Sequence, residues 1–325
     1  MPTAKTVLHS LHHQISPASP DFAQKGIAVR ILITGANSTV SRGIIPILKS
    51  AGHDIVLHDL VRLPDSDLFR GLPFVQGDIQ AGIGLDRAAD GCDLVLHTPA
   101  WHGIHWREKT EADFWRLNVD GTFNMFQAAV SAGITRVVFL SSMAWHGHYD
   151  KYGFTKQIGE ELCEYYRRNH KVRYVSIRPH DFTPWGADYV NHYGSRLLYG
   201  GVAWEDVLDC TNLAINKLAA PLDSDAETES IVVQAVRANA FTEDQLEGWE
   251  SDPIAACERI FPGALPLIQQ YGIRVTSKPA VVDAGAGAAQ LGYAPVHHFG
   301  TFLEHLRKLD TEGGNGAVAA MRCPY

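Results

Sequence analysis

Short apolar segments alternate with helical patterns along the first 180 residues, and this alternation restricts the fold more than any other feature. We expect the apolar segments to be strands over 29–34, 54–58, 74–76, 93–97, 136–140 and 173–177. The periodicity between them predicts helices over 41–51, 110–131 and 152–169. Strands that alternate with helices form a parallel sheet that is covered on both faces. The sequence therefore predicts an α/β fold built on a Rossmann-type doubly wound parallel sheet.

The alternation breaks down after Pro179, which indicates a second region. A helix over 206–220 and a strand over 231–236 are still expected there. We therefore predict a smaller C-terminal substrate-binding domain. The predicted division is a flexible N-terminal extension over 1–27, a Rossmann core over 28–180, a mainly substrate-binding region with returning core elements over 181–310, and a flexible tail over 311–325.

Charge and cysteine content restrict the partners and the compartment. The net charge of −8 argues against nucleic acid and anionic membrane, although small anionic ligands respond to local charge instead. Five scattered cysteines, an odd number without metal spacing, indicate reduced thiols in a cytoplasmic protein. No apolar run approaches the length of a membrane span. We expect a cytoplasmic protein whose partner is a small molecule.

Polar and glycine residues follow the predicted strands at the points where the strands end. Gly35, Asp59, Asp78, His97 and Ser142 each lie at or just past a strand end. Because ligands bind outside the carboxyl ends of the strands in open α/β sheets, we expect a ligand site at this edge.

Three motifs carry a family resemblance. Tyr152-Gly153-Phe154-Thr155-Lys156 is preceded by Ser141-Ser142 at a strand end and by Thr34-Gly35-Ala36 at the first turn. Together they resemble the extended branch of the short-chain dehydrogenase/reductase superfamily, the NAD-dependent epimerase/dehydratase family. The resemblance extends from about residue 29 to residue 308. It implies a dinucleotide-binding core over 28–180 and an enzyme that transfers hydride.

The resemblance implies that Ser142, Tyr152 and Lys156 are catalytic. Tyr152 and Lys156 are four residues apart and share one helical face. Oxidation of an alcohol needs a base for the hydroxyl proton, and a nearby ammonium together with the cofactor's positive nicotinamide should lower the pKa of the tyrosine for that role. Ser142 would orient the reacting oxygen, and Asn118 resembles the asparagine that braces the fourth helix in the family. The alternative for Tyr152 and Lys156 is an ordinary surface helix start.

The expected cofactor is NAD, with NADP less favoured. Of the three glycines that the family normally has at 35, 38 and 41, only Gly35 is present, and Ser38 and Ser41 are small replacements. Asp59 would accept ribose hydroxyls and repel a 2′-phosphate. The alternative is a turn that binds no dinucleotide. The resemblance and the strand ends together predict cofactor contacts at Gly35, Asn37, Ser38, Thr39, Val40, Asp59, Asp78, Ile79, His97, Thr98, Pro99, Tyr152 and Lys156.

A small substrate is expected. Only ten positions separate Ser142 from Tyr152, and Asp181 replaces an asparagine that seats nucleotide-sugar diphosphates in many members of the family. The segment around Arg196 resembles uronate dehydrogenases, which implies that Arg196 holds a substrate carboxylate, although a surface arginine is equally expected. The predicted substrate residues are Trp101, His102, Ser142, His146, His180 and Arg196. The histidine pairs lack further ligands at a recognised spacing, so we predict no metal.

The leading hypothesis is an NAD-dependent oxidoreductase that acts on a small hydroxylated substrate, such as a sugar or sugar acid. One alternative is an epimerase or dehydratase with a recycled cofactor, and another is a non-catalytic dinucleotide-sensing protein. The resemblance also implies a homodimer formed through the helices over 110–131 and 152–169. Glu160 and Glu161 are expected on a solvated helix face.

Overall fold

The computed structural model describes residues 27–145, 150–182, 189–221 and 230–319. A single sheet contains seven strands in the order β3-β2-β1-β4-β5-β6-β7, and every neighbouring pair is parallel. The strands are β1 (Arg30–Thr34), β2 (Asp54–Asp59), β3 (Phe74–Gln76), β4 (Leu94–His97), β5 (Arg136–Leu140), β6 (Arg173–Pro179) and β7 (Ser230–Ala235). The Rossmann-type fold predicted from the sequence is thereby confirmed.

The direction of strand order reverses between β1 and β4. Strands β2 and β3 follow β1 outward on one side, and the chain then returns so that β4 pairs with β1 on the other side. Thr34 pairs with His97 at the last position of this register. The turn after β1 and the segment after β4 therefore leave the sheet side by side, which is the arrangement that creates a ligand crevice.

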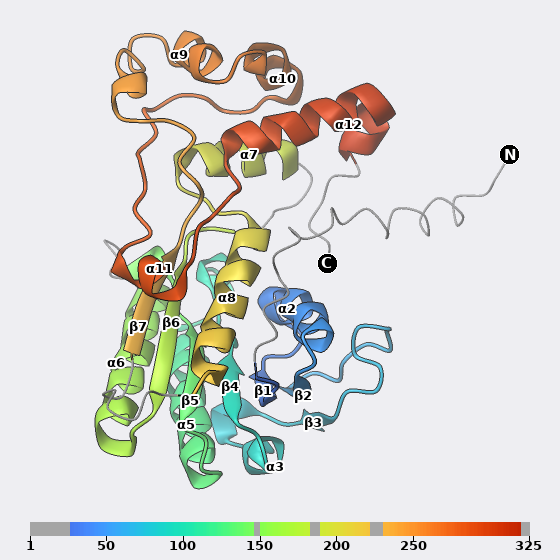
Figure 1. The fold of residues 1–325 in the computed structure, drawn as a ribbon, viewed down its shortest axis with the longest axis vertical. Coiled ribbons are helices and arrows are strands. Elements are labelled where there is room, and N and C mark those ends of the chain that lie inside the picture. Colours follow the sequence, from blue (N-terminus) through green and yellow to red (C-terminus); the bar gives the residue numbers. More distant parts are fainter. Residues whose placement is uncertain (1–26, 146–149, 183–188, 222–229, 320–325) are drawn as a thin grey trace, which may run out of the picture.

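Helices cover both faces of the sheet (Figure 1). Alternate residues of β1 point to opposite faces, with Ile31 and Ile33 in one apolar cluster and Leu32 in the other. Helices α2 (Thr39–Ser50) and α8 (Trp204–Ala219) pack on the first face. Helices α3 (Leu85–Ala89), α5 (Gly121–Ser131) and α6 (Lys151–His170) pack on the second. Burial on both faces explains why the strands are nearly continuous apolar runs.

Helix α6 lies unusually close to strand β5. Asp150 caps its start, and its side chain accepts a hydrogen bond of 2.6 Å from the backbone N–H of Gly153. A Cβ atom at Gly159 would lie 2.4 Å from Cζ of Phe139 on β5, so only glycine permits this approach.

The helix predicted over 110–131 is interrupted. It consists of α4 (Glu111–Trp115), a π-helical segment η4 (Arg116–Asp120) and α5. The backbone N–H of Gly121 bonds to the carbonyl oxygen of Arg116, which is the i→i+5 pattern of a π-turn. Periodicity alone could not indicate this local insertion, because the apolar stripe continues on both sides of it.

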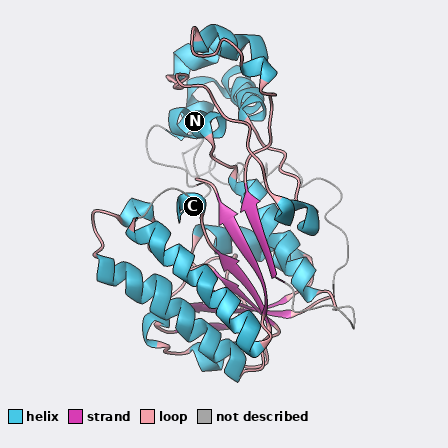
Figure 2. Cartoon of the chain, turned by 90° about the vertical axis from the view of Figure 1, so that its left-hand side faces the viewer, coloured by secondary structure: helices cyan, strands magenta, loops and turns pink. Residues whose placement is uncertain are grey.

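A smaller helical annex stands above the sheet and has its own apolar core (Figures 1 and 2). Its helices are α7 (Tyr189–Tyr199), α9 (Pro253–Ile260), α10 (Ala264–Tyr271) and α12 (Phe299–Ala319). Trp249 and Phe299 lie in that core. Strand β7, α8 and the short helix α11 (Ala286–Leu291) return to the sheet. Four short 3-10 helices complete the described elements, η2 (Ile79–Ala81), η3 (Gly103–His105), η5 (Met143–Trp145) and η6 (Asp244–Leu246).

The sequence predicts a flexible segment at each end of the chain. The predicted extension over 1–27 lies outside the described residues except for its last residue. Helix α12 continues to Ala319, so it enters the stretch that was predicted as a flexible tail from residue 311. Within the described ranges, no helix combines the length and the apolar character that crossing a membrane requires. The four described cysteines are buried and unpaired.

Candidate active site

Tyr152 lies in the first turn of α6 and faces the loop that follows β4. The centroid of its ring is 5.7 Å from that of His102 and 6.5 Å from that of Phe114. Ser142 lies close enough to act on Tyr152, since its side chain lowers the pKa of the phenol by hydrogen bonding. Ser142 comes two residues after β5, and its Oγ accepts a hydrogen bond of 3.0 Å from the backbone N–H of Ala144. The structure thus places the predicted pair Ser142 and Tyr152 near each other.

Lys156 is buried one turn after Tyr152. Its side chain reaches the end of β5, where Nζ donates a hydrogen bond of 2.6 Å to the carbonyl oxygen of Leu140. Burial lowers the pKa of Lys156 to about 7, and the charge of Glu160 opposes that shift. The ammonium is therefore held at the strand end from which Ser142 follows.

The expected lowering of the tyrosine pKa is absent from this geometry. Burial raises the pKa of Tyr152 to about 12, which outweighs the opposite effect of the hydrogen bond with Ser142. The charges of Asp150 and Asp181 raise it further. Desolvation of the phenolate dominates in this geometry, and the lowering expected from Lys156 together with a positively charged nicotinamide stays a prediction.

Asn118 fixes the loop beside Tyr152. Its Oδ1 accepts a hydrogen bond of 2.8 Å from the backbone N–H of Trp101, and its Nδ2 donates to the carbonyl oxygen of Trp101 at 3.1 Å and to Oγ1 of Thr155 at 2.9 Å. The π-turn that contains Asn118 points this amide at the site, and such turns are frequent at functional sites. The asparagine therefore connects the loop after β4 with helix α6.

His102 is held as a neutral imidazole. Burial, followed by the charges of Lys156 and His105, lowers its pKa to about 3. Its backbone N–H donates to Nδ1 of His105 at 3.0 Å. Trp101 contacts His105 edge to face at 4.9 Å and lies under Nζ of Lys109 at 4.2 Å. Trp101 and His102, both predicted substrate residues, therefore form one wall of the site next to Tyr152.

A cluster of hydroxyl groups occupies the first turn in place of the missing glycines. Oγ1 of Thr98 donates to the carbonyl oxygens of Thr34 and Gly35 at 2.8 and 3.0 Å. Ser38 and Ser41 lie 2.8 and 3.1 Å from the same Oγ1 and 2.9 Å from each other, measured between hydroxyl oxygens. The cluster joins the turn after β1 to the segment after β4. The two serines therefore connect these segments by hydrogen bonds at the point where the strand order reverses.

The residues at this turn fit a dinucleotide. Gly35 has a φ of +70°, and a Cβ there would lie 2.7 Å from Oγ1 of Thr98. Helix α2 begins at Thr39, and the first N–H groups of a helix have no intrahelical partner. Asp59 at the end of β2 accepts backbone hydrogen bonds from Asn37 and Val61 at 2.9 and 3.0 Å, and a carboxylate retains further lone pairs for hydroxyls.

Three other predicted cofactor residues are engaged in the structure of the protein itself. His97 is buried, with Nδ1 2.8 Å from Oγ1 of Thr34 and Nε2 3.1 Å from Oγ1 of Thr122. Its imidazole thus packs between sheet and helix, and only its backbone lies at the strand end. Asp78 caps the short helix η2, accepting from the N–H of Gln80 at 2.9 Å, and Ile79 is buried.

Arg196, the residue predicted to hold a substrate carboxylate, forms an ion pair within the protein. Nε of Arg196 on α7 lies 3.0 Å from Oδ2 of Asp181, which follows β6. Because the Asp181 charge acts on Tyr152, this pair lies near the reacting group. His180, next to Asp181, places Nδ1 2.5 Å from the carbonyl oxygen of Gly200. His146, the remaining predicted substrate residue, lies outside the described residues.

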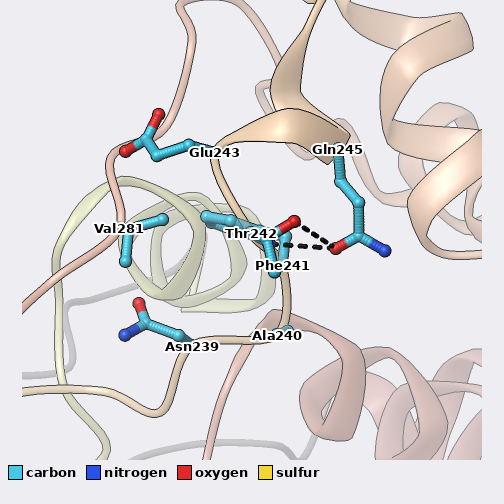
Figure 3. Close-up of a pocket in the computed structure, with 7 residues that line it drawn as sticks. All are labelled: Asn239, Ala240, Phe241, Thr242, Glu243, Gln245 and Val281. Carbon is cyan, nitrogen blue, oxygen red and sulfur yellow. Dashed lines mark hydrogen bonds between the residues drawn. The ribbon is translucent and has the colours of Figure 1, made fainter.

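The described residues offer no group of three or more histidine, cysteine, aspartate or glutamate side chains suited to a metal ion. A hollow of about 530 Å³ lies on the annex, formed by residues between 239 and 245 together with Val281 (Figure 3). Two of its polar side chains already form hydrogen bonds. Oε1 of Gln245 accepts a hydrogen bond from the backbone N–H of Thr242, and the Asn239 amide bonds to the backbone of Val282. None of the predicted site residues lines it.

Comparisons with known proteins agree with this geometry. The model of the family described as "NAD dependent epimerase/dehydratase family" matches residues 31–198, which is 168 of the 325 residues. A short-chain dehydrogenase/reductase family 42E member 1 from Xenopus laevis is 32% identical over 117 residues, which cover 34% of this chain and 29% of that protein. An L-arabinose 1-dehydrogenase (NAD(P)(+)) from Haloferax volcanii is 26% identical over 183 residues, covering 46% of this chain and 65% of that protein.

Solved structures share the fold over most of the chain. The structure described as MoeE5 in complex with UDP-glucuronic acid and NAD superimposes with a TM-score of 0.58 at 20% identity. It covers 86% of this chain and 99% of that one. Similarity at this level of identity establishes the shared architecture, including the C-terminal annex.

The hydroxyl cluster predicts that Thr98→Val destabilises the protein. The substitution keeps the shape but leaves the carbonyl oxygens of Thr34 and Gly35 without this donor, so the free energy of unfolding should fall by about 1–3 kcal/mol. Thr98→Ser keeps the hydroxyl and should lose less stability. Chemical denaturation of the three proteins measures the difference, and equal stability of the valine and serine variants would show that the cluster contributes nothing.

Proposed function

The chain belongs to the NAD-dependent epimerase/dehydratase family, and we propose that it is an NAD-dependent oxidoreductase of a small hydroxylated substrate, such as a sugar or sugar acid. The observation that carries this proposal is that Tyr152 lies near Ser142 in the first turn of α6, one turn before the buried Lys156, whose Nζ is bonded to the end of β5. These are an acid–base group, an orienting hydroxyl and a charge within one half-buried site.

Each of these side chains has a chemical role in the proposed reaction. When bound, NAD supplies the hydride acceptor and a positively charged ring that favours the phenolate of Tyr152. Tyr152 takes the proton from the substrate hydroxyl at its phenolic oxygen, while the carbon of that group loses a hydride and becomes a carbonyl. Ser142 holds the reacting oxygen, and neutral His102 provides a second hydrogen-bonding group on the facing wall. Lys156 stabilises the phenolate.

NAD is the cofactor of this family, and the chain's own residues favour it over NADP. The carboxylate of Asp59 lies beside the first turn, 2.9 Å from the N–H of Asn37, where it can accept ribose hydroxyls. A 2′-phosphate at the same place would meet a negative charge. Gly35 and the start of α2 hold the pyrophosphate in this proposal.

Two observations support a small substrate. The ion pair between Asp181 and Arg196 lies near Tyr152, so a nucleotide diphosphate would meet a carboxylate there. A small carboxylate could instead exchange with Asp181 on the guanidinium of Arg196. The name of the Haloferax volcanii relative, an L-arabinose 1-dehydrogenase, is consistent with a sugar. The annex would close over this substrate from the side of α7.

We also propose that the chain forms a homodimer in the cytoplasm. Large apolar side chains are exposed on α4, α5 and α6, namely Trp115, Phe123, Phe154 and Tyr165. These helices include the two segments predicted to pair, and large exposed apolar side chains on them are consistent with an interface. Light scattering should give about twice the chain mass of 35.7 kDa, whereas a single-chain mass at micromolar concentration would contradict the dimer.

The catalytic assignment predicts that Tyr152→Phe abolishes turnover, with a loss of about a hundredfold or more expected for an acid–base group. The phenyl ring still packs against His102 and Phe114, so affinity for NAD should change little. Spectrophotometric assay with a panel of sugars, sugar acids and polyols measures turnover, and fluorescence measures binding. Retained turnover in this variant would remove Tyr152 from the mechanism.

The second candidate is an epimerase or dehydratase with a recycled cofactor, which the family supports equally well. The two activities differ in the fate of the cofactor. The oxidoreductase should produce one NADH for each product molecule and exchange its cofactor freely. Cofactor that co-purifies with the protein, together with product formation and no net NADH, would favour the epimerase or dehydratase.

A further inference from the structure

A buried ion pair lies directly beneath the catalytic helix. Glu160 is one helical turn after Lys156, and Arg178 is on β6. Nε and Nη2 of Arg178 lie 2.8 and 2.5 Å from the two carboxylate oxygens of Glu160. The two side chains are only 16% and 12% exposed. The prediction of a solvated helix face for Glu160 is therefore wrong, because β6 brings a guanidinium to that face.

The charged and titratable groups around Lys156 come from several elements. On α6 they are Glu160 and Cys163, at the end of β4 His97, and in the following loop His102. Burial raises the pKa of Cys163, so it stays a neutral thiol. Burial lowers the pKa of both histidines to about 3, so neither is charged near neutral pH. Among these described groups, Glu160 is the anion that acts on Lys156.

The other neighbours of Lys156 do not supply a negative charge. From β5, Nζ meets the carbonyl oxygen of Leu140 at 2.6 Å and lies 5.2 Å from the ring centroid of Phe139. From β6, Arg178 is a cation, and its bidentate contact fixes the orientation of Glu160. Loss of Glu160 would therefore leave the buried Arg178 without this partner and remove the described anion that acts on Lys156.

We propose that Glu160 is a positioning residue that keeps Lys156 protonated beside Tyr152, and that Arg178 holds Glu160 in place for that purpose. The proposal rests on the proposed function, in which the ammonium of Lys156 stabilises the phenolate. Lys156 and Glu160 are buried four residues apart on one face of α6, so the negative charge of Glu160 opposes the effect of burial, which lowers the pKa of Lys156. Glu160 thus sets the upper pH limit of activity.

The direction of the effect follows from the charge. An opposite charge at close range raises the pKa of a lysine, typically by about 1–3 units. Glu160→Gln keeps the shape and removes the charge, so the pKa of Lys156 should fall by about one unit or more. Because the ammonium is then lost at a lower pH, the alkaline limb of kcat/KM should move down by the same amount.

Glu164→Gln is a matched control. Glu164 lies one turn further along the same helix and pairs with Arg167 and Arg168 at 2.8 and 2.5 Å. The control also removes an ion-paired glutamate from α6, but from a partner set that does not include Lys156. It should leave both the pKa of Lys156 and the pH profile unchanged.

The test is a pH titration by NMR of protein labelled at lysine Cε, with the Lys156 signal assigned from its absence in Lys156→Arg. The kcat/KM profile is measured on the same variants. A fall in the pKa of Lys156 in Glu160→Gln but not in Glu164→Gln is the expected result. An unchanged pKa in Glu160→Gln would overturn the proposal, even if the variant were less stable or less active.

Two provisions keep the outcomes separate. If Glu160→Gln does not fold, the double variant Glu160→Gln with Arg178→Gln leaves neither charge buried alone. Because a cation is removed together with the anion, the pKa of Lys156 should still fall, but by less than in the single variant, and an unchanged pKa would overturn the proposal here too. The NMR titration needs no turnover. A wild-type protein that oxidises nothing would therefore count against the proposed function, while the behaviour of the Lys156 signal would still decide the role of Glu160.

Discussion

The close contact between helix α6 and strand β5 is the constraint on which the site depends. Because position 159 has no side chain, Phe139 fits where a Cβ would lie only 2.4 Å away. At this separation the buried ammonium of Lys156 reaches the carbonyl oxygen of Leu140 at 2.6 Å. Ser142 follows β5 by two residues, and Tyr152 lies in the first turn of α6. The contact between α6 and β5 therefore also brings Ser142 and Tyr152 near each other. A bulkier residue at position 159 would move the lysine and the tyrosine away from the strand end together.

The sequence predicts the sheet and the position of the site well, for a physical reason. Strands buried on both faces must be apolar throughout, so their ends are marked by the first polar residue or glycine. Gly35, Asp59 and Ser142 are such markers, and all three lie at the carboxyl edge of the sheet. The switch point follows from topology, since parallel strands need crossovers. The C-terminal domain was expected from the loss of alternation, although its helices α7, α9, α10 and α12 were not.

Contacts between segments distant in the sequence could not be predicted. Glu160 looks solvent-exposed by its helical position, and only the pairing of β5 with β6 places Arg178, 18 residues later, against it. Arg196 was expected to be open to a carboxylate, whereas the fold supplies Asp181 as its partner. Asn118 occupies a π-turn that no periodicity reveals. In each case tertiary packing brings together residues that are distant in the sequence. The charged or amide side chain does not by itself indicate which residue it contacts.

The proposed function depends most directly on the binding of a dinucleotide at the first turn, where Ser38 and Ser41 replace two glycines. Titration of the purified protein with NADH and with NADPH, followed by tryptophan fluorescence, tests this. We predict saturable binding of NADH that is at least about tenfold tighter than that of NADPH, because Asp59 accepts ribose hydroxyls and repels a 2′-phosphate. Binding of neither nucleotide would contradict the account, since the hydroxyl cluster would then have closed the turn to pyrophosphate and left Tyr152 and Lys156 without a hydride acceptor.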